Sequence, residues 1–351
     1  MTVARLLRSL MPAAAAVVVL AVPGPVRAAA PAAAPAAAST ADRSAPAAGA
    51  AGIDVQGHRG ARGLAPENTL AGFRRALQIG VTTLEADLVV TADDVLVVHH
   101  DLRLNPDIAR NPDGRWIGGE GPPIRQLTLA ELQRYDVGRL RPGSSYARQW
   151  PHQAAVDGET IPTLQQLFEL GEASGRRPRY NLETKITPDS GAAAPDPETF
   201  ARLLVEAVRA AGLERRTTIQ SFDWRTLQVA QRLAPEIPTA CLTIESFRMH
   251  TVLPGPDGAS PWHAGLRLGD HGSSLPRLVQ VAGCRIWSMQ WRNLTAERAA
   301  EARALGLQLL PWTVNEPADM HRMIDLGVDG IITDYPDRLR QVLAERGLAL
   351  P

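Results

Sequence analysis

The chain has 351 residues, with 37 basic side chains, 37 acidic side chains, 8 His and 2 Cys. A net charge of zero disfavours a protein that mainly binds nucleic acid or anionic lipid, because such proteins usually carry a basic surplus. The 45% of hydrophobic and 21% of charged residues are typical of a globular protein. Two cysteines are too few for a disulfide scaffold or an all-cysteine zinc site. Of the basic residues, 36 are Arg and one, Lys185, is Lys.

The N-terminal region has the pattern of an export signal. Arg5 and Arg8 precede an apolar run at 11–22, and Val26-Arg27-Ala28 offers a small-residue cleavage site. Because a transmembrane helix needs about 20 apolar residues, this run is too short to span a bilayer. We expect a signal peptide at 1–28, cleaved near Ala28, a secreted or periplasmic protein, and no integral membrane segment in the mature chain.

Residues 29–51 hold 14 Ala and 3 Pro among 23 positions, which predicts a disordered linker. The first 51 residues contain four Arg and one Asp, so 33 basic and 36 acidic side chains remain, a net charge of −3. In an exported protein Cys241 and Cys284 could form a disulfide. Two buried free thiols are an equal alternative, because sequence does not fix their distance.

From residue 52 to 351, β-rich segments alternate with amphipathic helical segments. We predict strands at 54–58, 82–90, 180–185, 217–222, 239–244, 286–291, 308–314 and 330–333, and helices at 69–79, 197–211, 224–233, 296–305 and 317–326. This alternation favours an α/β fold, a (β/α)8 TIM-type barrel. No Gly-x-Gly-x-x-Gly follows the first strand and no Walker loop is present, which disfavours a nucleotide-binding sheet.

Two segments interrupt the alternation. Residues 101–160 form an insertion after the second-strand hairpin, rich in Pro, Gly and Arg, with one helix expected at 128–135. Residues 245–284 are similarly loop-like. Long excursions after barrel strands form active-site walls, and we interpret both segments in this way, not as separate domains. For 245–284, plain surface decoration is an equally good interpretation.

Charged residues gather where predicted strands end. His58 and Arg59 follow the first strand, and Glu85 and Asp87 share one face of the second because residues two apart point the same way. Glu183 and Lys185 share a face of the third strand. Three carboxylates together favour a hard cation, Ca²⁺ or Mg²⁺. Buried salt bridges with Arg are the alternative.

The hairpin after the second strand predicts which His joins this group. If Ala92 and Asp93 form a two-residue loop, residues whose numbers sum to 185 lie opposite each other. Glu85 is then opposite His100, and His99 points to the other face. Two His suit acid–base catalysis near neutral pH, while an Arg, a Lys and a divalent cation suit a phosphoryl group. The pattern indicates metal-assisted phosphodiester cleavage.

Over residues 53–343 the chain resembles the glycerophosphodiester phosphodiesterase family. The resemblance rests on the order and spacing of short motifs: His58-Arg59-Gly60, Pro66-Glu67-Asn68-Thr69, Glu85-Ala86-Asp87, the His-Asp ending of 97–101, 181–185, Gln220-Ser221-Phe222, Trp312-Thr313-Val314-Asn315 and 329–336. The family's insertion after the His-Asp motif is also present.

The resemblance implies a role for each residue of the predicted site. By resemblance the metal ligands are Glu85, Asp87 and Glu183, the acid–base pair is His58 and His100, and the phosphate is held by Arg59 and Lys185. Glu67 and Asn68 would brace the first loop, or else cap the helix at Thr69. Trp312 would contact the glycerol or the leaving alcohol, or else pack in the core.

The implied reaction is metal-dependent hydrolysis of a small-molecule glycerophosphodiester to glycerol 3-phosphate and an alcohol. We expect Ca²⁺ as the cation, with Mg²⁺ possible. A phospholipase D-like enzyme acting on lysophospholipids or sphingolipids is an alternative, with Trp262, Trp287 and Trp291 as an apolar approach ridge. A non-catalytic phosphodiester-binding barrel is a minor alternative.

Overall fold

A computed structural model of the chain describes residues 52–350. The predicted signal peptide and linker lie outside these residues. The described part contains the strands β1 (Asp54–Gly57), β2 (Thr83–Val90), β3 (Leu96–Val98), β4 (Arg179–Thr184), β5 (Thr217–Ser221), β6 (Thr239–Thr243), β7 (Ile286–Met289), β8 (Gln308–Leu309) and β9 (Gly330–Thr333).

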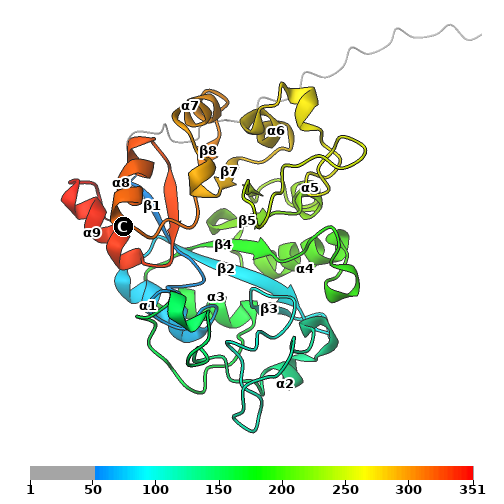
Figure 1. The fold of residues 1–351 in the computed structure, drawn as a ribbon, viewed down its shortest axis with the longest axis vertical. Coiled ribbons are helices and arrows are strands. Elements are labelled where there is room, and N and C mark those ends of the chain that lie inside the picture. The colour runs from blue at the N-terminus through cyan, green and yellow to red at the C-terminus, as the bar shows by residue number, and fades with distance from the viewer. Residues whose placement is uncertain (1–51, 351) are drawn as a thin grey trace, which may run out of the picture. The chain divides into compact units, whose positions relative to one another are not determined.

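The helices follow most of these strands and pack outside them (Figure 1). They are α1 (Leu70–Ile79), α2 (Leu129–Leu132), α3 (Leu164–Ala173), α4 (Pro197–Ala210), α5 (Trp224–Leu233), α6 (Leu275–Val281), α7 (Ala296–Ala304), α8 (Pro317–Asp325) and α9 (Pro336–Glu345). The helices α3, α6 and α9 were not among the predicted segments. The α6 helix lies inside the segment that we expected to be loop, where Ser274 caps its first turn.

Eight of the described strands are parallel and form a nearly closed barrel, in the order β8-β7-β6-β5-β4-β2-β1-β9. Backbone hydrogen bonds from Asp329 to Leu309 and from Ile332 to Pro311, both 3.0 Å, join the β8 and β9 segments. The predicted (β/α)8 barrel is confirmed. The β8 strand is shorter than the predicted 308–314, because Pro311 has no backbone N–H to donate.

The hairpin register that we predicted is wrong by one residue. Leu88 pairs with Val98 and Val90 with Leu96, so opposed residues sum to 186 and the loop has three residues. Asp94 takes a left-handed φ of 59°, a conformation that Asp tolerates. Because β3 ends at Val98, the position of His100 is set by the turn after the strand and not by the ladder.

The interior of the barrel is chemically divided. On β1, β4 and β5 it is polar: the Asn181 amide donates to Gln56 at 2.8 Å and to Gln220 at 3.0 Å. On the opposite side Ala240, Ile286, Leu310 and Ile332 form an apolar cluster against which Trp312 packs. A larger hydrophobic core fills the layer between strands and helices. The insertion at 101–160 has a small core of its own, which includes Leu104, Ile124 and Leu132.

Candidate active site

A cavity of about 170 Å³ opens where the parallel strands end. Seven of the ten predicted site residues line it: His58, Arg59, Glu85, His100, Glu183, Lys185 and Trp312. The other lining residues are Arg62, Gln220, Phe222, Leu242, Thr313 and Ile332. The remaining predicted residues, Glu67, Asn68 and Asp87, are buried. Glu67 binds Arg59 of the wall and Asp87 lies beside Lys185 of the wall, while Asn68 donates to Asp87.

The three predicted metal ligands form one buried cluster. Glu85, Asp87 and Glu183 each offer an oxygen atom, and these atoms lie within 4.8 Å of one another. Glu85 also accepts from the Gln220 amide at 2.8 Å and from the backbone N–H of Arg59 at 2.8 Å. An all-oxygen donor set of this kind fits a hard divalent cation.

The neighbouring cations do not offset the burial of all three carboxyl groups, because the pKa values of two of them are raised. Burial, together with Asp87 and Glu183, raises the pKa of Glu85 well above its usual range. Burial raises the pKa of Glu183 to about 7, against the lowering effect of Lys185. For Asp87 burial is outweighed by Arg59, His100 and Lys185, which hold its pKa well below its usual range. These carboxylates therefore fit a divalent cation, whose charge favours all three in the ionised form.

Two positively charged side chains, Lys185 and Arg59, contact the carboxylate cluster. Lys185 Nζ lies 2.7 Å from Glu183 Oε1 and 3.6 Å from Asp87 Oδ1. Arg59 donates from Nη1 to Glu67 at 2.7 Å, and its Nε lies 3.1 Å from Asp87 Oδ2. Both side chains are held by carboxylates before any ligand arrives, so they present fixed positive charge to the cavity.

The first loop is braced by the residues that the sequence suggested. Asn68 donates from its amide to Asp87 Oδ2 at 2.9 Å, and Glu67 binds Arg59. The cap of α1 is Thr69, whose hydroxyl accepts from the Gly72 N–H at 3.1 Å, so capping is not the role of Glu67 or Asn68. Asn68 and Arg59 take left-handed φ values of 54° and 51°, a conformation that clusters at functional sites.

His58 is oriented by a carboxylate that the sequence reasoning did not single out. Its Nδ1 lies 2.7 Å from Oδ1 of Asp334, which follows β9 and is fully buried. Arg62 donates from Nε to the same oxygen at 2.8 Å, and Asn315 donates to Oδ2 at 2.7 Å. Burial and Arg62 lower the pKa of His58 although Asp334 raises it. Burial therefore favours the neutral form of the imidazole.

His100 has a similar arrangement. Its Nδ1 lies 2.7 Å from Asp101 Oδ1, and Asn105 donates to the other oxygen at 2.9 Å. Burial, Arg59 and Lys185 lower the pKa of His100 to about 4. His99 is buried with Nε2 unpartnered among the described residues and does not line the cavity. The adjacent Asp101 belonged to the His-Asp motif and was the available signal for this pair.

One wall of the cavity is aromatic. The Phe222 ring makes edge contacts with Trp312 at 5.4 Å and with Trp262 at 6.3 Å between centroids. Trp262 comes from the 245–284 segment and is half-buried. Trp287 and Trp291 are buried, so the predicted three-tryptophan approach ridge is wrong for these two.

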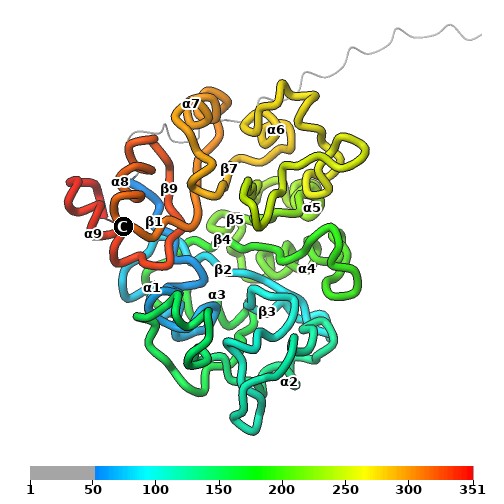
Figure 2. Tube along the Cα trace, viewed as in Figure 1, coloured from blue at the N-terminus to red at the C-terminus, as the bar shows by residue number. Residues whose placement is uncertain are grey.

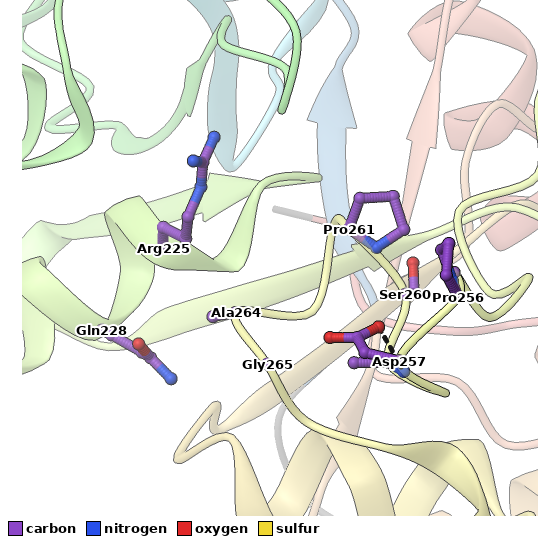
Figure 3. Close-up of a pocket in the computed structure, with 10 residues that line it drawn as sticks. Arg225, Gln228, Pro256, Asp257, Ser260, Pro261, Ala264 and Gly265 are labelled. Carbon is purple, nitrogen blue, oxygen red and sulfur yellow. Dashed lines mark hydrogen bonds between the residues drawn. The ribbon is translucent and has the colours of Figure 1, made fainter.

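A larger hollow of about 540 Å³ shares no lining residue with this cavity (Figure 3). It separates Arg225 and Gln228 of α5 from the loop that carries Asp257, Ser260 and Pro261. The Arg225 guanidinium is already bound to Asp223, at 2.8 Å from Nε. None of the predicted site residues lines this hollow.

The model of the glycerophosphoryl diester phosphodiesterase family matches residues 58–338. The chain belongs to this family. A glycerophosphodiester phosphodiesterase of Caldanaerobacter subterraneus subsp. tengcongensis is 31% identical over 299 residues, which cover 84% of this chain and 98% of the relative. A crystal structure of a protein assigned to the same family, from Silicibacter pomeroyi DSS-3, shares 37% identity with a TM-score of 0.76, covering 86% of this chain and 96% of that one.

The barrel is also similar to a phosphodiesterase from Oleispira antarctica, solved in complex with the product sn-glycerol-3-phosphate. That structure has a TM-score of 0.60 at 24% identity and covers 84% of this chain and 97% of its own. As a member of the glycerophosphoryl diester phosphodiesterase family the chain is a phosphodiester hydrolase, and the non-catalytic barrel is set aside. None of the described helices is long and apolar enough to cross a membrane.

Proposed function

We propose that the protein hydrolyses glycerophosphodiesters to glycerol 3-phosphate and an alcohol, with His58 and His100 as the acid–base pair. The observation that carries the proposal is that two imidazoles line one small cavity, each with Nδ1 bound to a carboxylate. This bond fixes Nδ1 as the donor and leaves Nε2 of each ring for proton transfer. The Oleispira relative binds the proposed product.

The two His divide the proton transfers between them. One ring takes a proton from the attacking oxygen, and the other donates a proton to the oxygen of the leaving alcohol. Arg59 and Lys185 hold the phosphate, since both line the cavity and carry fixed charge. The negative charge of a bound diester favours the imidazolium form of a neighbouring His, which supplies the acid.

Glu85, Asp87 and Glu183 would hold a divalent cation in this scheme, and we propose Ca²⁺, with Mg²⁺ as the alternative. When bound there, the cation supplies charge stabilisation for phosphoryl oxygens. Their all-oxygen chemistry supports a hard cation. The preference for Ca²⁺ follows from the proposed export, because Ca²⁺ is abundant outside cells.

Secretion or transfer to the periplasm is part of the same proposal. The N-terminal pattern of basic residues, apolar run and small-residue site supports it. The disulfide between Cys241 and Cys284 is also typical of oxidising compartments.

A second candidate substrate class is lysophospholipids or sphingolipids, cleaved in the manner of a phospholipase D. Phe222 and Trp312 line the cavity, and Trp262 contacts the Phe222 ring. These aromatic side chains favour this candidate, because they offer an apolar surface beside the charged residues of the cavity. Head-group release from glycerophosphocholine, lysophosphatidylcholine and sphingomyelin, measured side by side, decides between the classes.

The test of the His roles uses the leaving group. His58→Ala and His100→Ala should each lose most turnover of glycerophosphocholine. On a glycerophosphate ester of p-nitrophenol, which needs no protonation to leave, the variant that lacks the acid should recover and the variant that lacks the base should not. Near-normal turnover of glycerophosphocholine by both variants refutes the mechanism.

A further inference from the structure

A segment of the insertion is fastened to the loop that follows β1. We call residues 144–154 the latch. The Ala154 N–H donates to the Leu64 carbonyl at 3.0 Å, and the Gln153 amide donates to the Arg62 carbonyl at 2.8 Å. The insertion, which includes α2, lies on the side of the barrel that carries α1 and α3 (Figure 2). The latch therefore contacts the backbone of the same loop that presents His58 and Arg59.

The hydroxyl of Tyr146, in the latch, contacts two residues that each bind a different part of the active site. Tyr146 Oη donates to Glu67 Oε2 and accepts from Arg62 Nη1 at 3.4 Å. Glu67 in turn binds Arg59, and Arg62 binds Asp334, the carboxylate that orients His58. Tyr146 is thus linked to Arg59 through Glu67, and to Asp334 through Arg62.

The electrostatics of this junction keep the hydroxyl a donor. Burial and the charge of Glu67 raise the pKa of Tyr146, so the phenol stays protonated. For Glu67 burial is outweighed by Arg59 and Arg62, which lower its pKa, so it is ionised. A hydrogen bond from a neutral donor to a buried carboxylate is among the stronger ones in proteins.

A second residue of the latch holds Arg62 from the other side. The Trp150 ring lies 4.3 Å from the guanidinium carbon of Arg62, a cation–π contact. The same ring lies 6.4 Å from the ring of Tyr335, which follows Asp334. Arg62 is therefore held between Asp334, Tyr146 and Trp150.

We propose that Tyr146, assisted by Trp150, is a positioning residue for the reaction: it fixes Arg62 against the His58–Asp334 pair and Glu67 against Arg59. The insertion then helps to position the side chains of the active site. The proposal goes beyond the proposed reaction and uses it only in the activity assay.

The direct test is the pKa of His58 in the substrate-free protein, followed by NMR of the imidazole C–H signals and assigned with a His58→Gln variant. The charged groups around His58 include Asp334, Arg62, Arg59 and Asp87. Arg62 lowers the pKa of His58. In Tyr146→Phe and in Trp150→Leu, Arg62 loses one of the contacts that hold it and keeps its bonds to Asp334, so its guanidinium should be less fixed beside His58 and the pKa of His58 should rise. Tyr135→Phe is the matched control, since Tyr135 packs against the insertion's own core.

The activity test measures kcat and KM for glycerophosphocholine in the same variants. Tyr146→Phe should lose about tenfold to a hundredfold in kcat/KM, the range that one hydrogen bond to a charged group is worth. The pH limb that reports His58 should move to higher pH, while Tyr135→Phe keeps the wild-type profile.

An unchanged His58 pKa in Tyr146→Phe overturns the proposal, whatever its activity. Activity within twofold of wild type also overturns it, as does a loss matched by an equal loss of folded protein. If the wild type does not turn over any glycerophosphodiester, the proposed function fails, but the NMR result still decides the role of the latch.

Discussion

The disulfide between Cys241 and Cys284 makes a prediction about stability whose size follows from the structure. Cys241 lies in β6 and Cys284 lies two residues before β7, with their Cα atoms 5.8 Å apart and both side chains buried. The bond joins the two ends of the loop that carries Trp262. Replacing either cysteine with alanine should destabilise the protein, chiefly because the unfolded chain gains freedom.

The size of the effect depends on the closed loop. The two cysteines are 43 residues apart in sequence, and the loop-closure relation then gives about 4 kcal/mol at 25 °C. With an unfolding entropy of about 2.1 cal/mol/K per residue, this corresponds to a fall in Tm of about 6 °C for a domain of this size.

The assay is a double-mutant cycle in reversible guanidinium unfolding, with Cys241→Ala, Cys284→Ala and the double variant. Either single variant already breaks the bond, so each should lose about 4 kcal/mol and the double variant little more. The slope of unfolding against denaturant should rise, since the uncrosslinked chain exposes more surface. Two small, additive losses of about 1 kcal/mol each, as expected for independent buried thiols, would refute the reasoning.

Four further predictions concern the site and the fold. Asp334→Asn should lower kcat about a hundredfold to ten-thousandfold with little change in KM, because His58 loses the carboxylate that sets its tautomer, and steady-state kinetics checks this. Lys185→Arg should cost at least about tenfold in kcat/KM, since a larger planar guanidinium replaces the compact ammonium that contacts two carboxylates. Wild-type activity of this variant would show that the reaction does not require a lysine at this position. His263 is buried, and its ring has no hydrogen-bond partner among residues 52–350. Burial lowers its pKa to about 4, so the unfolded state takes up a proton as pH falls through about 6.5 and stability declines down to about pH 4. His263→Phe should remove up to about 3 kcal/mol of that decline, as urea unfolding at several pH values would show. Chelation should abolish activity, Ca²⁺ should restore it, and added Ca²⁺ should raise the Tm of wild type but not of Glu85→Gln, which scanning calorimetry would test.

The barrel could be predicted because its signals are local. Strand and helix periodicity marked the alternation, and the two-residue spacing placed Glu85 with Asp87 on one face of β2. The hairpin register could not be predicted from the same information. A two-residue and a three-residue loop fit the turn sequence equally well, and only the left-handed Asp94 distinguishes them.

The partners of the site residues were harder to predict than the residues themselves. Asp334 is 276 residues from His58 in sequence, and nothing in the local pattern links them. Its place directly after β9 was the available signal, because all parallel strands of a barrel end at the same rim. Tyr146 had no such signal, since the insertion has no periodicity that would show which of its side chains faces the barrel.

The buried charges of the site explain why a divalent cation fits it. Glu67, Glu85, Asp87 and Glu183 are opposed by Arg59 and Lys185, while Arg62 and Asp334 neutralise each other. Four formal negative charges against two positive ones leave an excess of two, which one divalent cation cancels. A bound phosphodiester then restores one negative charge, and protonation of one imidazole is the response that balances it. The lone lysine, between Glu183 and Asp87, is thus one of the two charges that set this balance.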